Sequence, residues 1–304
     1  MMTPMTGSDG YRALRRKADM LRVRIKNRMQ RRTRCYPHDL GLLAIMKNEA
    51  MNLDEWIRHH LWQGVDRIYL IDNGSTDDTA QVLAPWLASG RVSCISCPEP
   101  HGQWHHYRKA IRNFSIRAQC RWLMLADLDE FWFRPDGGTL PDLLADFDKF
   151  DLIYTNWSIF GSSGLRGHPD SIRRSLTLRR PGLGPHDSTK WILRTSSLHR
   201  TSQIGIHKVR GINSRRTVSD NERLRINHYI IQSEDYFRRV KMTRGSAALA
   251  SRDSLRDMEY FRGIDVLCTE EDRLLADMLA RQDPIRLSDR LRDRAPSDHP
   301  VPAV

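Results

Sequence analysis

A regular alternation of short apolar runs with helical patterns begins near Leu40 and constrains the fold more than any other feature. Residues 42–46, 68–71, 92–97 and 121–126 have the length and apolar content of buried strands. Between these runs, apolar residues recur at spacings of three and four, which is typical of helices that cover a sheet. The sequence therefore predicts an α/β fold with a mostly parallel sheet, flanking helices and right-handed crossovers.

Local signals place the boundaries of these elements. Asn52, followed three residues later by Glu55, has the pattern of a helix N-cap, and the helix is expected to continue to Gly64. A second helix is expected over residues 104–119, directly before the fourth strand. We expect one domain over residues 38–283, with a ligand-binding half (38–135) and a loop-rich half (136–283), followed by a mobile polar tail over residues 284–304.

Positive charge is concentrated in an N-terminal arm, residues 1–37. Of the formal net charge of +12, residues 35–304 carry only +3, because residues 11–34 hold eleven Lys or Arg against one acid, Asp19. Apolar residues recur along this arm at helical spacing, so we expect a basic helix. It either remains solvated or lies on an anionic membrane surface. Nucleic acid is an unlikely partner, because the arm lacks interleaved aromatic residues.

The remaining composition points to a cytoplasmic protein, peripheral at the inner membrane face if the arm binds lipid. No apolar run approaches the ~20 residues that span a bilayer, and the N-terminus has no apolar signal core. Five scattered cysteines give no disulfide framework.

Two carboxylates, Asp127 and Asp129, follow the fourth predicted strand. Side chains at i and i+2 of an extended segment point the same way, so both can reach one cation. Hard carboxylate oxygens suit Mn²⁺ or Mg²⁺, and such an ion can bridge two phosphates of a nucleoside diphosphate. A D-x-D pattern alone is weak evidence, because acids often end strands as solvated caps.

Four segments in sequence order give this pair its context. Residues 44–49 (AIMKNE), 72–79 (DNGSTDDT), 122–131 (WLMLADLDEF) and 160–164 (FGSSG) resemble the motifs of bacterial family 2-like and family 92-like glycosyltransferases. The resemblance implies a GT-A fold and a metal-dependent, inverting transfer of sugar from a nucleotide-sugar, expected to be a UDP-sugar, to a glycan or lipid-linked acceptor. The resemblance makes residues 38–135 the nucleotide-sugar-binding half and residues 136–283 the acceptor-side half. The matches thin out beyond residue 165, so the acceptor stays unnamed.

The resemblance also implies roles for individual residues. Asp72 at a strand end can accept from a base N–H, with Asn73 and the backbone of Gly74 close to the nucleoside. Asp77 either contacts the nucleotide or caps a helix. The nucleotide-sugar site is expected to include Lys47, Asn48, Glu49, Asp72, Asn73, Asp77 and Asp127. Candidates for pairing with the diphosphate are Lys190, Arg194, Lys208, Lys241 and Arg244.

Two roles stay open between candidates. A third metal ligand, usually a His in GT-A enzymes, corresponds to either His207 or His228. An inverting transfer needs a carboxylate base near the acceptor. The usual Glu-Asp pair of family 2 is not evident, so Asp187 is the first candidate, with Glu130 and Asp170 behind it.

Two other classes of function compete with this prediction. A sugar nucleotidyltransferase uses a similar sheet and acidic metal ligands, but it normally carries a Gly-rich triphosphate loop that residues 47–49 do not provide. An inactive adaptor that binds membrane or nucleic acid through its basic arm would not need the acids at 127 and 129.

Overall fold

The computed structural model describes residues 35–100, 102–185, 188–244 and 256–281. The predicted basic helix within residues 11–34, the tail at 284–304 and Asp187 lie outside the described residues. The chain divides into two units, residues 1–37 and 38–304, and every described helix and strand belongs to the second.

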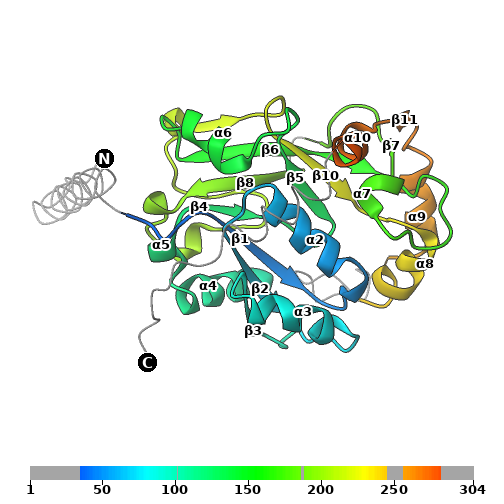
Figure 1. Cartoon of the computed structure of the whole chain (residues 1–304), viewed down its shortest axis with the longest axis horizontal. Helices are drawn as coiled ribbons and strands as arrows, with labels where there is room; N and C mark the ends of the chain where they lie inside the picture. Colours follow the sequence, from blue (N-terminus) through cyan, green and yellow to red (C-terminus); the bar gives the residue numbers. More distant parts are fainter. Residues whose placement is uncertain (1–34, 101, 186–187, 245–255, 282–304) are drawn as a thin grey trace, which may run out of the picture. The chain divides into compact units, whose positions relative to one another are not determined.

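The second unit is built on one mixed sheet with helices packed against it (Figure 1). Its strands are β1 (His38–Met46), β2 (Arg67–Asp72), β3 (Val92–Ser96), β4 (Cys120–Leu125), β5 (Glu130–Phe133), β6 (Leu152–Phe160), β7 (Leu178–Arg179), β8 (Thr189–Arg194), β9 (Thr217–Ser219), β10 (Arg225–Tyr229) and β11 (Glu270–Glu271). The main path of the sheet runs β11-β7-β6-β8-β4-β1-β2-β3; β10 pairs with β5 and β6, and β9 pairs with β6.

The helices up to residue 146 are α2 (Ala50–Trp62), α3 (Thr79–Ala88), α4 (Gln103–Asn113), α5 (Ile116–Gln119) and α6 (Leu140–Asp146), the last of which already lies in the second half. Those after residue 146 are α7 (Ile172–Ser175), α8 (Glu234–Tyr236), α9 (Met258–Asp265) and α10 (Leu274–Ala280). Short 3₁₀ turns occur at η1 (Thr195–Ser197), η2 (Thr201–Gln203) and η3 (Ser214–Arg216), and η4 (Phe237–Lys241) is a π-helical turn.

The first four strands confirm the predicted parallel, doubly wound arrangement. β2 and β4 flank β1, β3 lies beyond β2, and all of these pairings are parallel. The chain therefore winds outward from β1 in one direction and then returns to its other side. The point where the winding direction changes lies between β1 and β4, and ligands of open α/β sheets bind at such a point.

Burial on both faces explains why these strands are continuous apolar runs. Leu42 and Ala44 of β1 join the core beneath α2, together with Trp56. The alternate residues Leu43 and Ile45 join a second core beneath α4. Since side chains alternate across a strand, one strand supplies both cores.

Two predicted helix boundaries were wrong. The first helix begins at Ala50, so Asn52 lies inside α2 and is buried rather than capping it. The helix predicted over residues 104–119 is split into α4 and α5 at Ser115, whose φ is +49°. The described helices include none with the length and apolarity needed to span a bilayer.

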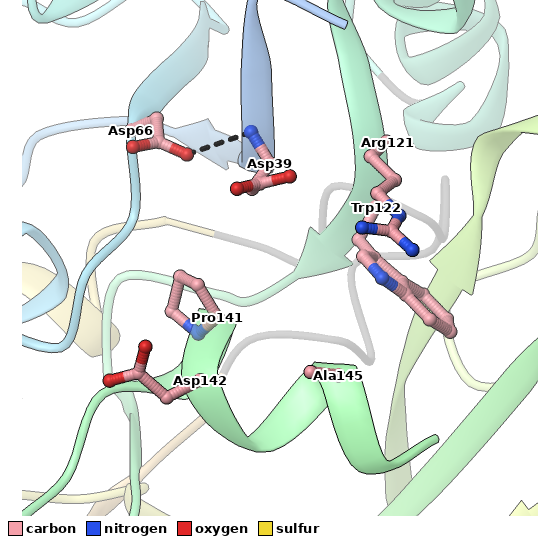
Figure 2. A pocket seen from close by; sticks show the side chains of 7 residues that line it. All are labelled: Asp39, Asp66, Arg121, Trp122, Pro141, Asp142 and Ala145. Carbon is pink, nitrogen blue, oxygen red and sulfur yellow. Dashed lines mark hydrogen bonds between the residues drawn. The ribbon is translucent and has the colours of Figure 1, made fainter. Parts of the chain in front are cut away.

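A cavity of about 470 Å³ opens at the edge of the sheet where β1 begins. Figure 2 shows its lining, which includes Asp39, Asp66, Trp122 and Asp142. Asp66 is already used there, because its Oδ2 accepts the Asp39 backbone N–H at 2.9 Å. The predicted ligand residues follow the opposite ends of the strands, so this cavity is separate from the site described below.

Candidate active site

The polar turns after β1, β2 and β4 emerge at one edge of the sheet. In the parallel register Met46 lies beside Asp72, and Leu43 lies beside Leu125. The turn at residues 47–49 and the acidic turn at 127–130 therefore flank the point where the winding direction changes. The structure brings together segments that the sequence placed about 80 residues apart.

Tryptophan side chains fix the acidic turn from beneath. The Trp56 indole N–H on α2 donates to the carbonyl oxygens of Asp127 and Glu130, both at 3.0 Å. The Trp132 indole N–H donates to the Leu125 carbonyl at 3.0 Å. Because buried indole rings hold these carbonyl groups, the backbone that carries the carboxylate side chains is held in place.

Asp127 is paired with a lysine from the second half of the chain. The Lys190 Nζ on β8 lies 2.8 Å from Asp127 Oδ2 and 3.5 Å from Glu130 Oε2. Burial disfavours the ammonium, but the carboxylates of Asp127 and Glu130 outweigh it and raise the pKa of Lys190. Lys190 is thus a fully buried cation beside the acidic turn.

Asp129 is held at both oxygens. His228 Nε2 on β10 lies 3.4 Å from Oδ1, and the Lys241 ammonium on η4 donates to Oδ2. Burial alone would raise the pKa of the Asp129 carboxyl, but Lys241 and His228 outweigh burial and hold the pKa well below its usual value. Asp129 is therefore an ionised carboxylate in a buried setting.

Glu130 points back into the same cluster. Its Oε2 accepts the Asp127 backbone N–H at 2.8 Å, and burial raises the pKa of the Glu130 carboxyl well above its usual value. We expected Glu130 as a candidate base for the acceptor. Glu130 is fully buried beside Asp127, so we count it with the side chains that could bind a metal ion.

Ligand atoms of Asp129, Glu130 and His228 lie within 4.8 Å of one another, close enough to hold one metal ion. Among the residues that the structure describes, Asp127 Oδ1, Glu130 Oε1 and His228 Nδ1 are buried polar atoms without a hydrogen-bond partner, which is costly unless a ligand or water engages them. Carboxylate oxygens with one imidazole suit Mn²⁺ or Mg²⁺. These residues therefore fit a divalent cation.

The geometry separates the two histidine candidates. His228 joins the carboxylate group, whereas His207 Nδ1 lies 3.1 Å from the Thr189 carbonyl oxygen, outside that group as the structure describes it. Both rings contact Trp157, with centroid distances of 4.3 Å for His228 and 5.3 Å for His207. Burial lowers the pKa of His207.

The turn after β1 is tied to the second half of the chain through Glu49. This side chain is 2% exposed; its Oε2 accepts from the Tyr236 hydroxyl at 2.8 Å, and its Oε1 from Arg244 at 2.5 Å. Arg244 also donates to the Lys47 carbonyl oxygen. Both carboxylate oxygens of Glu49 thus bind protein groups, while Asn48 joins the neighbouring turn by accepting the Thr76 N–H at 2.8 Å.

The side chains of the turn after β2 differ in whether the protein already uses their polar atoms. Asp72 Oδ1 accepts from the Ser75 N–H at 2.9 Å and its hydroxyl at 2.7 Å, which leaves Oδ2 for another donor. The Asn73 amide donates to the Cys97 carbonyl at 2.6 Å. Asp77 accepts the backbone N–H groups of Ala50 and Thr79, both at 3.1 Å, so it caps both α2 and α3.

Comparison with known proteins identifies the family. The profile of glycosyltransferase family 92 matches residues 44–258, which is most of the chain. The chain belongs to glycosyltransferase family 92. A family 92 protein of Ricinus communis is 27% identical over 219 residues, covering 67% of this chain and 38% of the relative. The chain thus spans about two fifths of that relative's length.

Two further similarities are more distant. The galactan β-1,4-galactosyltransferase GALS1 of Arabidopsis thaliana is 26% identical over 106 residues, covering 32% of this chain and 21% of that protein. The crystal structure of S. aureus TarS 1-349 in complex with UDP-GlcNAc aligns with a TM-score of 0.40 at 14% identity, over 84% of this chain and 71% of that chain. The expected likeness to family 92 is confirmed. Its bacterial character gains no support, because both sequence relatives are plant proteins.

Several residues of this family 92 site gave no usable signal in the sequence. Trp56, Trp157 and Tyr236 are absent from the predicted site residues. Each contacts a group more than 60 residues away, so local periodicity could not reveal it. Of the remaining base candidates, Asp170 is exposed in a turn and Asp187 lies outside the described residues.

Proposed function

We propose that this chain transfers a sugar from a nucleotide-sugar, specifically a UDP-sugar, to a glycan or lipid-linked acceptor with the help of Mn²⁺ or Mg²⁺. The observation that carries the proposal is the convergence of Asp129, Glu130 and His228 beside the turns after β1 and β2. Family 92 membership supports glycosyl transfer, and the similarity to a galactosyltransferase makes a galactosyl donor the first one to test.

Asp129, Glu130 and His228 would hold the cation, with the unpartnered Asp127 Oδ1 next to them. A divalent ion at this place would neutralise charge on the departing diphosphate. The family resemblance adds inversion at the anomeric carbon to the proposal, and NMR of the product's anomeric configuration tests it.

The chain's own residues define the rest of the donor site. Asp72 Oδ2 can accept a base N–H, since Ser75 engages only Oδ1. Gly74, with φ of +79°, keeps the adjacent backbone open to a nucleoside. Lys190 supplies a buried positive charge, which favours a diphosphate over a neutral ligand.

Thermal unfolding with Mn²⁺ and a panel of nucleotides tests the proposal. UDP at about 100 times its Kd should stabilise the chain by about 2.7 kcal/mol, or roughly 5–11 °C for a domain of this size. GDP and dTDP should have smaller effects. Asp129→Asn should abolish the Mn²⁺-dependent part of the shift, whereas Asp136→Asn, an exposed acid after β5, should keep it.

Product analysis separates this function from its alternatives. With a UDP-sugar and Mn²⁺, slow donor hydrolysis should release UDP. A sugar nucleotidyltransferase would instead release pyrophosphate from a nucleoside triphosphate and a sugar phosphate. If no nucleoside diphosphate with metal stabilises the chain, the transferase proposal fails and a non-catalytic role replaces it.

A further inference from the structure

Each aspartate of the acidic turn has its own buried lysine. Lys190 Nζ lies 2.8 Å from Asp127 Oδ2, and Lys241 Nζ donates to Asp129 Oδ2. The two lysine side chains are 0% and 4% exposed. They come from β8 and η4, which lie 63 and 112 residues after their partners. Each aspartate carboxylate is therefore paired with one ammonium group, and Lys190 also lies 3.5 Å from Glu130 Oε2.

An ammonium group paired with a carboxylate opposes the binding of a metal cation by the same carboxylate. Burying an ammonium group costs several kcal/mol of desolvation, so two buried lysines are not retained for packing alone. A divalent ion that enters beside these pairs meets two aspartates whose charge the ammonium groups already offset, and it is repelled by the ammonium groups themselves. A nucleoside diphosphate that enters with the ion brings the negative charge that compensates them.

We propose that Lys190 and Lys241 make the binding of metal and diphosphate mutually dependent. The inference rests on the proposed function and adds to it a cause for cooperative binding. In the free protein the lysines neutralise Asp127 and Asp129 and so weaken the attraction for a bare cation. A diphosphate that entered with the ion would bring negative charge that offsets both the ion and the ammonium groups, so each ligand would favour the binding of the other.

Lys241 is the better lysine to test. It belongs to a π-helical turn, a geometry often found at functional sites. Its ammonium and His228 Nε2 hold opposite oxygens of Asp129, so Lys241 also orients the carboxylate toward the histidine. Lys190, by contrast, contacts two carboxylates at once, and its removal would disturb both.

Mn²⁺ binding measured by electron paramagnetic resonance, with and without saturating UDP, tests the inference without relying on activity. The full chain should bind Mn²⁺ at least about fivefold more tightly when UDP is present. Lys241→Met should bind Mn²⁺ alone more tightly than the parent chain and lose most of the UDP effect. Lys241→Arg keeps the charge and should retain the effect, as should Lys149→Met at an exposed position after α6.

The outcomes separate this inference from the proposed function. If the parent chain binds Mn²⁺ equally well with and without UDP, or if Lys241→Met keeps both the parent affinity and the parent coupling, the lysines are structural and the inference is overturned. If UDP does not bind even with Mn²⁺, the proposed function itself fails. Should Lys241→Met not fold, Lys241→Gln, which also removes the positive charge, carries the same test with the same expected gain and loss.

Discussion

Replacing Glu49 with alanine should destabilise the chain far more than it weakens nucleotide binding. Glu49 follows β1 in a segment that resembles a donor-site motif, yet its carboxylate binds Tyr236 at 2.8 Å and Arg244 at 2.5 Å. These partners lie 187 and 195 residues later in the chain. The carboxylate therefore joins the end of β1 to the segment around α8 and η4.

The expected cost follows from burial and charge. Removing one partner of a buried ion pair costs about 3–5 kcal/mol, because the remaining charge is left uncompensated. The Arg244 side chain is 17% exposed and keeps some access to water, so we take the lower end, about 3 kcal/mol. At 2–4 °C for each kcal/mol, the melting temperature should fall by about 6–12 °C. Glu49→Gln retains an acceptor for Tyr236 and should cost less.

Urea unfolding followed by tryptophan fluorescence measures the change in free energy of unfolding. Glu234→Ala is the matched control, because Glu234 pairs with Arg238 at the surface, at i and i+4, and should cost no more than about 0.5 kcal/mol. The reasoning fails if Glu49→Ala unfolds like the parent chain while its affinity for UDP drops. In that case Glu49 is a donor ligand, as the family resemblance implied.

Three further predictions concern the metal site, a helix cap and acid stability. His228→Ala should weaken Mn²⁺ binding in the presence of UDP by about tenfold or more, whereas His207→Ala should leave it nearly unchanged. Electron paramagnetic resonance measures both affinities, and an equal loss of Mn²⁺ affinity in the two variants would contradict the assignment of His228 as the ligand. Asp77→Ala removes the side chain that accepts the first backbone N–H of both α2 and α3, and it should lower the free energy of unfolding in urea by about 2 kcal/mol. If UDP affinity falls and the free energy of unfolding does not, Asp77 is a nucleotide ligand instead. Burial lowers the pKa of His60 to about 3, so between pH 6.5 and 3 the unfolded chain binds a proton at this residue that the folded chain does not. His60 therefore lowers stability by about 1.4 kcal/mol for each unit that pH falls through this range. His60→Phe should reduce the slope by this amount without abolishing it, because burial also lowers the pKa of His59, and an unchanged slope would refute the reasoning.

The strand ends were predictable because their signals are local. Short apolar runs define β1, β2 and β4, and parallel pairing then requires their polar turns to share one edge. The sequence thus located Asp127 and Asp129 correctly beside the turn at residues 47–49. It could not decide between His207 and His228, because both follow short apolar stretches. Only the pairing of β10 with β5 places His228 opposite Glu130.

Roles that depend on distant contacts could not be predicted. Gly161 in the 160–164 motif shows why: a side chain there would meet the Asp265 carboxylate and the Cβ of Cys268, both at 2.7 Å. Ser162 donates its backbone N–H to that carboxylate at 2.7 Å, and the Ser163 hydroxyl accepts the backbone N–H groups at 177 and 178. The described contacts of this motif are therefore close packing and backbone hydrogen bonds, which the motif match alone does not indicate.

The predicted nucleotide-sugar-binding half (residues 38–135) and the predicted acceptor-side half (residues 136–283) share one cluster of charged side chains. Asp127 and Asp129 belong to the first half, but the groups that neutralise them, Lys190 and Lys241, come from the second. A buried carboxylate without a partner is costly, so the acidic turn depends on the later segments for its charged form. The same holds for Glu49, which Tyr236 and Arg244 engage. Under the proposed function, substitutions in the second half should therefore alter metal and nucleotide binding, because side chains from both halves complete the acidic cluster.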